Sequence, residues 1–183
     1  MRFSETNLPG AFVIDPERHA DERGFFARTW CREEFAAHAL ETKLIQCSVS
    51  FNTKAGTLRG LHSPILILEV KLVRYPRRYI RCDRRFARGL GSFRHHFSVT
   101  LTAENGRALY IPGNLAHGFL TLEPGTEVFY QMSESFRPDY ARGVRWNDPA
   151  LWHQLAPTRP GHLHARRGLP TSRPRRDVPR LGR

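Results

Sequence analysis

Apolar and polar positions along this chain alternate in short blocks rather than in long helical periods. Apolar segments of roughly four to eight residues are bounded by Gly, Pro, Asn or Asp, which is typical of β-strands. Residues 33–40 have the spacing of a short helix. Strands are expected over residues 11–14, 25–30, 44–51, 56–62, 70–74, 97–101, 108–111, 118–122 and 127–132. Many short strands with little helix predict an all-β sandwich or barrel.

The length of 183 residues suits one domain with a substantial core. We place this domain over residues 1–150 and expect the Pro- and Arg-rich residues 151–183 to be disordered. No apolar run resembles a signal peptide or reaches the roughly 18 residues that a membrane span needs. Three cysteines without C-x-x-C spacing favour reduced thiols and a cytoplasmic location.

The net charge of +12 would suit a nucleic-acid binder, but it is unevenly distributed. Residues 74–94 and 158–183 each contain eight Arg and one Asp, so each has a net charge of +7. The remaining 136 residues therefore have a net charge of −2 and contain no nucleic-acid-binding motif. An Arg-rich nucleic-acid binder is the less favoured class of function, and steep salt dependence of binding would be its signature.

Two glycine-punctuated segments carry the candidate chemistry. Residues 56–62 read Gly-Thr-Leu-Arg-Gly-Leu-His, and residues 111–119 read Ile-Pro-Gly-Asn-Leu-Ala-His-Gly-Phe. An imidazole titrates near neutral pH and a guanidinium pairs with anions, so these residues indicate proton transfer on an anionic ligand. A lone histidine in an apolar strand is usually structural. Two histidines in similar settings, with Arg59 before His62, favour a functional site.

These two segments belong to a set of seven runs, which cover residues 21–26, 56–62, 71–74, 101–105, 111–119, 129–133 and 145–149. In order and spacing the set resembles the dTDP-4-dehydrorhamnose 3,5-epimerase family, over residues 3–73 and 93–149. The resemblance implies a cupin-type jelly roll and a homodimer that uses no cofactor. It also implies epimerisation of dTDP-4-keto-6-deoxy-D-glucose at C3 and C5.

The resemblance also assigns roles in proton transfer. His62 matches the base that removes a proton beside the 4-keto group, and Tyr130 matches the acid that returns one to the opposite face. Lys71 matches a cation that would stabilise the developing enolate. The residue types alone leave other readings open: a core position for His62, packing for Tyr130, and a solvated strand position for Lys71.

Further residues match substrate contacts of the family. Arg23 and Arg59 match contacts to the diphosphate, for which the planar guanidinium is suited because it donates two parallel hydrogen bonds. The residues that match the lining of the sugar and nucleotide pocket are Phe26, Gln46 and His117.

Many cupins bind a metal ion, and whether this chain can do so depends on how many metal ligands its sequence offers. Here only His62 and His117 match metal-binding positions, and Ser63-Pro64 follows where a second histidine would stand. Two candidate ligands are too few for a typical site, so we expect no metal.

Two segments depart from the family pattern. In residues 77–88 strict alternation would place arginines on both faces of a central strand, where burying an unpaired Arg is strongly unfavourable. We therefore expect this segment to loop out and leave a sheet edge unpaired. Read one base later, the codons permitted for residues 78–87 allow GIYDVIVDLR, an alternating apolar strand. A shift after residue 150 allows a family-like tail, so we infer two reading-frame shifts, with a divergent insert and tail as the alternative.

The chain as written lacks an Asp that orients the catalytic histidine in the family, and the shifted tail would restore it. Ser48 stands where the family often has Asn, and Phe136 stands at an aromatic position that is often Tyr. These departures leave two alternatives open. One is an impaired or inactive relative that binds nucleotide sugar, and the other is a single-site epimerase or ketoisomerase on a related dTDP-sugar.

Overall fold

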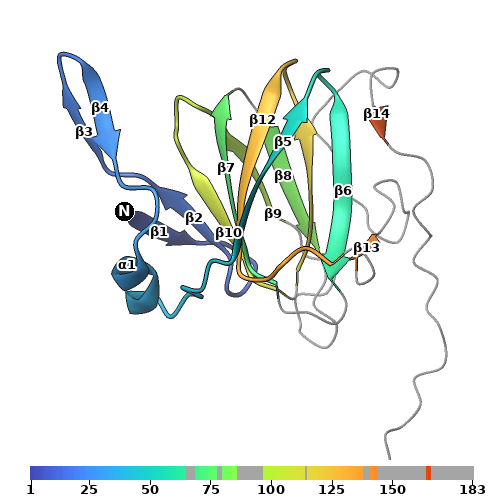
Figure 1. Ribbon diagram of the computed structural model, residues 1–183, viewed down its shortest axis with the longest axis horizontal. Coiled ribbons are helices and arrows are strands. Elements are labelled where there is room, and N and C mark those ends of the chain that lie inside the picture. Colours follow the sequence, from blue (N-terminus) through green and yellow to red (C-terminus); the bar gives the residue numbers. More distant parts are fainter. Residues whose placement is uncertain are drawn as a thin grey trace, which may run out of the picture.

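The structure is a computed structural model and describes residues 1–64, 69–77, 80–85, 97–113, 115–137, 141–143 and 164–165. These residues form two β-sheets packed face to face, with a small hairpin and a short helix at one end (Figure 1). The all-β sandwich predicted from the strand pattern is therefore confirmed.

The first sheet has the strand order β1-β2-β10-β7-β12-β5, with antiparallel neighbours throughout. Along its edge strand, side chains alternate between half-buried and exposed, as expected when one face covers a core. Its strands are β1 (Arg2–Glu5), β2 (Phe12–Asp15), β5 (Gln46–Asn52), β7 (Lys71–Arg77), β10 (Ala108–Ile111) and β12 (Thr126–Met132).

The second sheet has the order β13-β6-β11-β8-β9. A short strand near the C-terminus, β14, runs parallel to β6 and pairs with its first residues. The strands of this sheet are β6 (Thr57–Pro64), β8 (Ile80–Arg85), β9 (Phe97–Leu101), β11 (Ala116–Thr121), β13 (Ala141–Gly143) and β14 (His164–Ala165).

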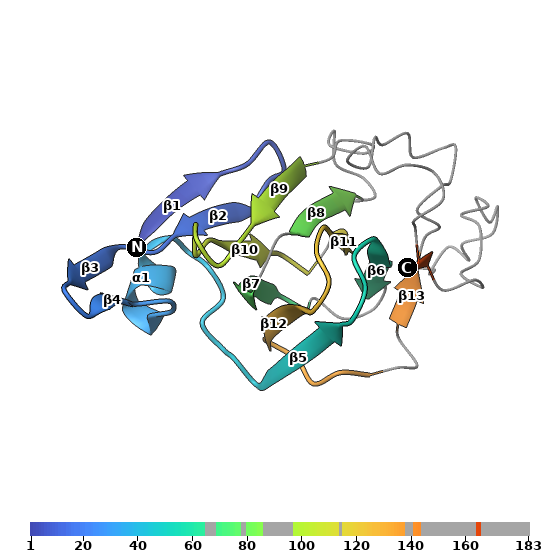
Figure 2. The same cartoon turned by 90° about the horizontal axis from the view of Figure 1, so that it is seen from above.

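The hairpin of β3 (Arg18–Asp21) and β4 (Gly24–Ala27) forms a separate two-stranded sheet. Figures 1 and 2 both show it at the end of the molecule opposite β6. Helix α1 (Arg32–Ala37) follows, and it overlaps the helix expected over residues 33–40 but begins one residue earlier and ends three residues earlier. Two acidic residues in its first turn interact favourably with the helix dipole.

The expectation that the Arg-rich segment loops out is wrong. Strand β8 pairs with β11 from Ile80 to Arg85 and with β9 along its other edge, so it fills a central position in the second sheet. Strand pairing uses the backbone N–H and C=O groups, which arginine supplies as well as any other residue. The side chains of β8 lie outside the described residues, as does the tail apart from His164–Ala165.

The main core lies between the two sheets. It combines side chains from four strands of the first sheet's interior and from β9 and β11 of the second sheet. Its buried members are Leu8, Ala11, Val73, Leu101, Leu109, Ile111, Leu115, Phe119 and Val128. Side chains that share a face with these residues therefore point into the space between the sheets.

A second cluster covers the outer face of the first sheet. Phe35 of α1 packs edge-on against Tyr110 of β10, with ring centroids 6.1 Å apart. Leu72 of β7 belongs to this outer cluster, whereas its neighbour Val73 belongs to the inner core. Strand alternation then places Lys71 on the inner face together with Val73.

Candidate active site

Three predicted site residues share the inner face of the first sheet. Lys71 lies opposite Met132, which in turn lies opposite Gln46 on the edge strand. In the adjoining row Tyr130 lies opposite Val73, and its ring packs against the core between the sheets. Directly opposed residues project from the same side of a sheet. The register therefore brings Lys71, Tyr130 and Gln46 together.

The second sheet contributes the two histidines and Arg59. His62 of β6 pairs directly with His117 of β11, and their ring centroids are 6.3 Å apart. Arg59 pairs with Phe119, which belongs to the core between the sheets. These three residues therefore face the first sheet, and with Gln46, Lys71 and Tyr130 they form what we call the inner-face cluster.

An irregularity in β6 makes this arrangement possible. Arg59 and His62 are three residues apart, and in a regular strand they would project from opposite faces. The pairing register of β6 with β11 shifts between His117 and Phe119, which changes the alternation at this point. Both Arg59 and His62 can then face the inside.

Two glycines allow the strands to meet closely at the shift. A Cβ on Gly118 would lie 2.7 Å from the carbonyl oxygen of Arg59, and one on Gly60 would lie 2.6 Å from the Cα of Gly118. Gly60 also has a φ of +113°, which side chains disfavour. Larger residues at either position would push β6 and β11 apart.

The electrostatic setting of His62 favours its neutral form. The pKa of His62 lies below its ordinary value of 6.5 because surrounding protein removes hydration, and because cationic Lys71 and Arg59 lie nearby. His62 is nonetheless an exposed residue, so its loss of hydration is partial. A neutral imidazole near pH 7 can accept a proton, which is what a general base requires.

The guanidinium of Arg59 is held by a buried amide. Its Nε donates a 2.7 Å hydrogen bond to Oδ1 of Asn52, which is 2% exposed. The Nδ2 of Asn52 donates to the carbonyl oxygens of Ser50 and Thr126, at 3.1 Å each, which fixes the amide orientation. One terminal nitrogen of Arg59 makes a long 3.5 Å contact with the carbonyl oxygen of Phe51, so the guanidinium is held along β5.

The amide of Gln46 is engaged within the protein. Its Nε2 donates to Ser48 Oγ at 3.0 Å, and its Oε1 accepts from the backbone N–H of Phe136 at 2.9 Å. Gln46 therefore ties β5 to the segment that follows β12. Ser48, where the family often has Asn, is one of its partners.

Arg23 and Phe26 are not brought to the inner-face cluster within one chain. Both lie on the β3–β4 hairpin, at the end of the molecule away from β6 (Figures 1 and 2). The Arg23 side chain is 81% exposed and pairs with Asp21 at 2.6 Å, and Phe26 is 75% exposed. Within a single chain, Arg23 and Phe26 therefore cannot contact the same substrate molecule as His62.

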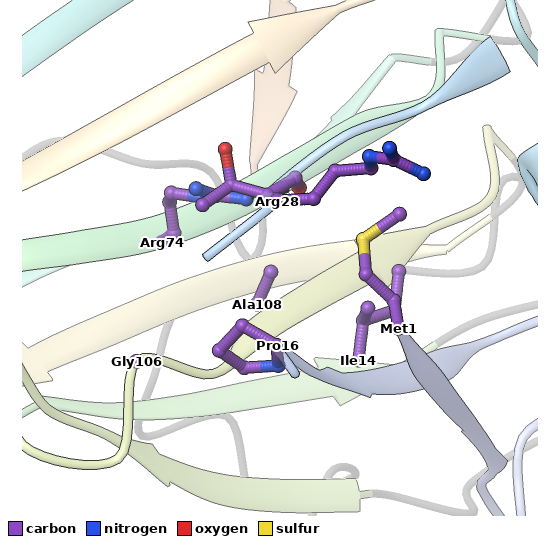
Figure 3. Close-up of a pocket in the computed structure, with 8 residues that line it drawn as sticks. Met1, Ile14, Pro16, Arg28, Arg74, Gly106 and Ala108 are labelled. Carbon is purple, nitrogen blue, oxygen red and sulfur yellow. Dashed lines mark hydrogen bonds between the residues drawn. The ribbon is translucent and has the colours of Figure 1, made fainter. Parts of the chain in front are cut away.

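A shallow depression lies on the other side of the first sheet (Figure 3). It is lined by Met1, Ile14, Pro16, Arg28, Thr29, Arg74, Gly106 and Ala108. Burial lowers the pKa of Arg74 to about 10, so its guanidinium stays protonated at neutral pH, and it donates to the carbonyl oxygen of Thr29. The sheet separates this depression from the inner-face cluster, so it is not the candidate site.

Among the residues that the structure describes, no three His, Cys, Asp or Glu side chains gather as metal ligands would. No helix in the described ranges is long and apolar enough to cross a bilayer. Cys31 and Cys47 are both free thiols.

Sequence and structure comparisons identify the family to which this geometry belongs. The model of the dTDP-4-dehydrorhamnose 3,5-epimerase family matches residues 5–164. The chain belongs to this family. A Methanothermobacter thermautotrophicus protein named dTDP-4-dehydrorhamnose 3,5-epimerase is 37% identical over 154 residues, which cover 82% of each chain.

Solved structures of the family superpose on the fold. The Bacillus anthracis dTDP-4-dehydrorhamnose 3,5-epimerase, with TDP and PPi bound, has a TM-score of 0.79 and 31% identity, covering 85% of this chain and 92% of its own. The Mycobacterium tuberculosis epimerase has a TM-score of 0.87 and 26% identity, covering 93% and 88%. The predicted family, cupin-type fold and isomerase function are confirmed. The family match also spans residues 74–93, where the sequence showed no resemblance.

Two residues with a part in the site were missed from the sequence. Asn52 anchors Arg59, and Glu69 forms an ion pair with Lys71. Asn52 could have been found as a polar residue that continues the inward-facing positions of an alternating strand. Glu69 could have been found from its position two residues before Lys71, because alternate residues of an extended chain share a face.

Proposed function

We propose that the inner-face cluster epimerises dTDP-4-keto-6-deoxy-D-glucose at C3 and C5, giving dTDP-4-keto-L-rhamnose. The observation that supports this most is the setting of His62, an imidazole with a lowered pKa beside two cations. A base that is neutral near pH 7 can remove a proton beside a ketone. The cations can stabilise the negative charge that then develops.

In this mechanism His62 removes the proton on the carbon beside the 4-keto group. Lys71 donates to the 4-keto oxygen, on which the enolate charge develops. Tyr130 returns a proton from the first sheet, whereas His62 acts from the second. Because acid and base lie on opposing sheets, the new proton reaches the opposite face of the sugar and inverts the carbon.

The diphosphate would be bound by Arg59, with its Nε held by Asn52. An anchored Nε leaves the outer edge of the guanidinium to donate two parallel hydrogen bonds to phosphate oxygens. His117 and Gln46 line the same space.

We further propose a homodimer in which Arg23 and Phe26 enter the partner's site. An isolated two-stranded hairpin with exposed Phe25 and Phe26 gains stability only against another surface. Strand β5 offers such a surface, since it is a sheet edge whose outward side chains Val49 and Phe51 are exposed. We also propose a cytoplasmic location, in keeping with the free thiols.

Proton exchange tests the assignment of the base. The wild-type chain should exchange the C5 proton of dTDP-4-keto-6-deoxy-D-glucose with D2O, followed by NMR, and His62→Ala should abolish exchange. His38→Ala is the control, because His38 lies beyond α1 and stacks on Phe3, at 4.0 Å between ring centroids. Wild-type exchange in His62→Ala would refute the assignment. No exchange in the wild-type chain would favour the inactive nucleotide-sugar-binding alternative.

Mixing two inactive variants tests the shared site. If Arg23 acts in the partner's site, a dimer of one His62→Ala chain and one Arg23→Ala chain contains one intact site. Co-refolded mixtures should then recover activity that neither variant has alone. No recovery, despite formation of the mixed dimer, would place Arg23 outside the partner's site.

A further inference from the structure

We infer that Glu69 is a positioning residue for Lys71, and that its carboxylate holds the Lys71 ammonium at the 4-keto oxygen. The inference rests on the proposed role of Lys71. Nζ of Lys71 lies 3.2 Å from Oε2 of Glu69, and the two side chains are only 13% and 9% exposed. This is an ion pair within the protein rather than a surface contact.

The backbone between the two residues is held on both sides. The N–H of Val70 donates to Oγ of Ser133 at 2.9 Å, and the N–H of Ser133 donates to the Val70 carbonyl oxygen at 3.1 Å. Val70 itself points outward into the cluster under α1. Glu69 and Lys71 therefore project inward from a segment tied to the end of β12.

Among the described residues, no other donor to the Glu69 carboxylate is found besides Lys71. Its other oxygen, Oε1, is buried and has no hydrogen-bond partner among the residues described. A buried ammonium needs a counter-charge, because removing it from water is otherwise strongly unfavourable. Glu69 is the acidic residue that the described part of the chain places against Lys71.

The other groups facing this space increase the need for a counter-charge. Arg59 and His62 project from β6, His117 from β11 and Tyr130 from β12. Lys71 and Arg59 both act on the pKa of His62, so three basic side chains lie within electrostatic reach of one another. Without Glu69, the Lys71 ammonium would be repelled by these neighbours and would lose its fixed position.

The test uses Glu69→Gln, which keeps the shape of the side chain and removes its charge. We expect kcat to fall about 10–100-fold, because a displaced Lys71 no longer stabilises the enolate. KM should change much less, since Arg59 binds the diphosphate. Glu69→Asp, which keeps a carboxylate at this position, should recover most of the lost kcat. Glu5→Gln, at an exposed position on β1 at an edge of the same sheet, is the control.

A double-mutant cycle shows whether Glu69 acts through Lys71. In a Lys71→Met background, Glu69→Gln should lower kcat by no more than about 2-fold. A full loss in that background would overturn the inference, and so would an unchanged kcat for Glu69→Gln alone.

Folding of the variants gives a second measurement. If Glu69→Gln does not fold, the variant lacking both charges should fold, because no ammonium is left unpaired. Failure of both variants alike would overturn the inference. The two proposals can also be told apart. An active wild-type chain, an inactive His62→Ala and an unaffected Glu69→Gln would remove only the role of Glu69.

Discussion

Replacing Gly118 by alanine should lower catalytic activity by more than the accompanying loss of folding stability can explain. The added Cβ would lie 2.7 Å from the Arg59 carbonyl oxygen and 3.1 Å from Cδ2 of Leu61. Ordinary contacts begin near 3.4 Å, so β6 must move from β11 by about 0.7 Å. Overpacking of this kind typically destabilises a protein by about 1–3 kcal/mol. In a chain of this length each kcal/mol lowers Tm by about 2–4 °C.

The displaced strand carries both Arg59 and His62. A misplacement of about 1 Å can lower the rate about 10²-fold, so we expect kcat/KM of Gly118→Ala to fall about 30–100-fold. The assay compares turnover of dTDP-4-keto-6-deoxy-D-glucose well below the Tm of each variant, so that unfolding does not contribute.

Gly125→Ala is the matched control. A Cβ there would meet nothing within 4 Å, but the φ of +69° makes alanine unfavourable by about 1–2 kcal/mol. This variant should lose comparable stability and keep wild-type turnover. Full activity in Gly118→Ala would refute the reasoning, as would equal losses of activity in the two variants.

The remaining predictions concern chemistry, binding and stability. Tyr130→Phe should still wash deuterium into the substrate while forming epimer about 10²–10⁴-fold more slowly; equal product formation would remove Tyr130 from the mechanism. Asn52→Leu should weaken dTDP binding, measured by calorimetry, about 10-fold or more, since Arg59 loses a charge-assisted hydrogen bond; unchanged affinity would show that Arg59 needs no anchor. The acid limb of kcat/KM should lie below pH 6.5, because the pKa of His62 is lowered. Because the pKa of His62 is lower in the folded chain, the unfolded chain binds the imidazole proton more tightly. His62 should therefore reduce the free energy of unfolding only as the pH falls below 6.5. Prolonged chelation should leave turnover unchanged, and activity lost to EDTA and restored by one divalent ion would contradict a metal-free site.

The sequence alone predicted the all-β fold class and the candidate residues for the chemistry. Alternation with a period of two is a local property, so most strands could be placed from the order of apolar residues. The glycine-punctuated segments that contain His62 and His117 indicated a candidate site, because those residue types suit proton transfer. The roles of Lys71 and Tyr130 were predicted from the resemblance of these segments to the epimerase family.

The tertiary structure decided which side chains meet. The register shift that turns Arg59 and His62 to one face depends on β11, whose pairing with β6 is not encoded in β6 alone. The contact of Asn52 with Arg59 likewise joins two strands of different sheets. Only the packed sheets could show these contacts.

The two largest departures from expectation have the same physical origin. Residues 80–85 form a central strand despite their arginines, because backbone pairing with β9 and β11 is indifferent to side-chain type. Arg23 and Phe26 lie far from His62 because a hairpin folds from its own turn and strands, whatever site its side chains serve. Local sequence determines strands and turns, whereas the partners of each strand are set by the whole chain.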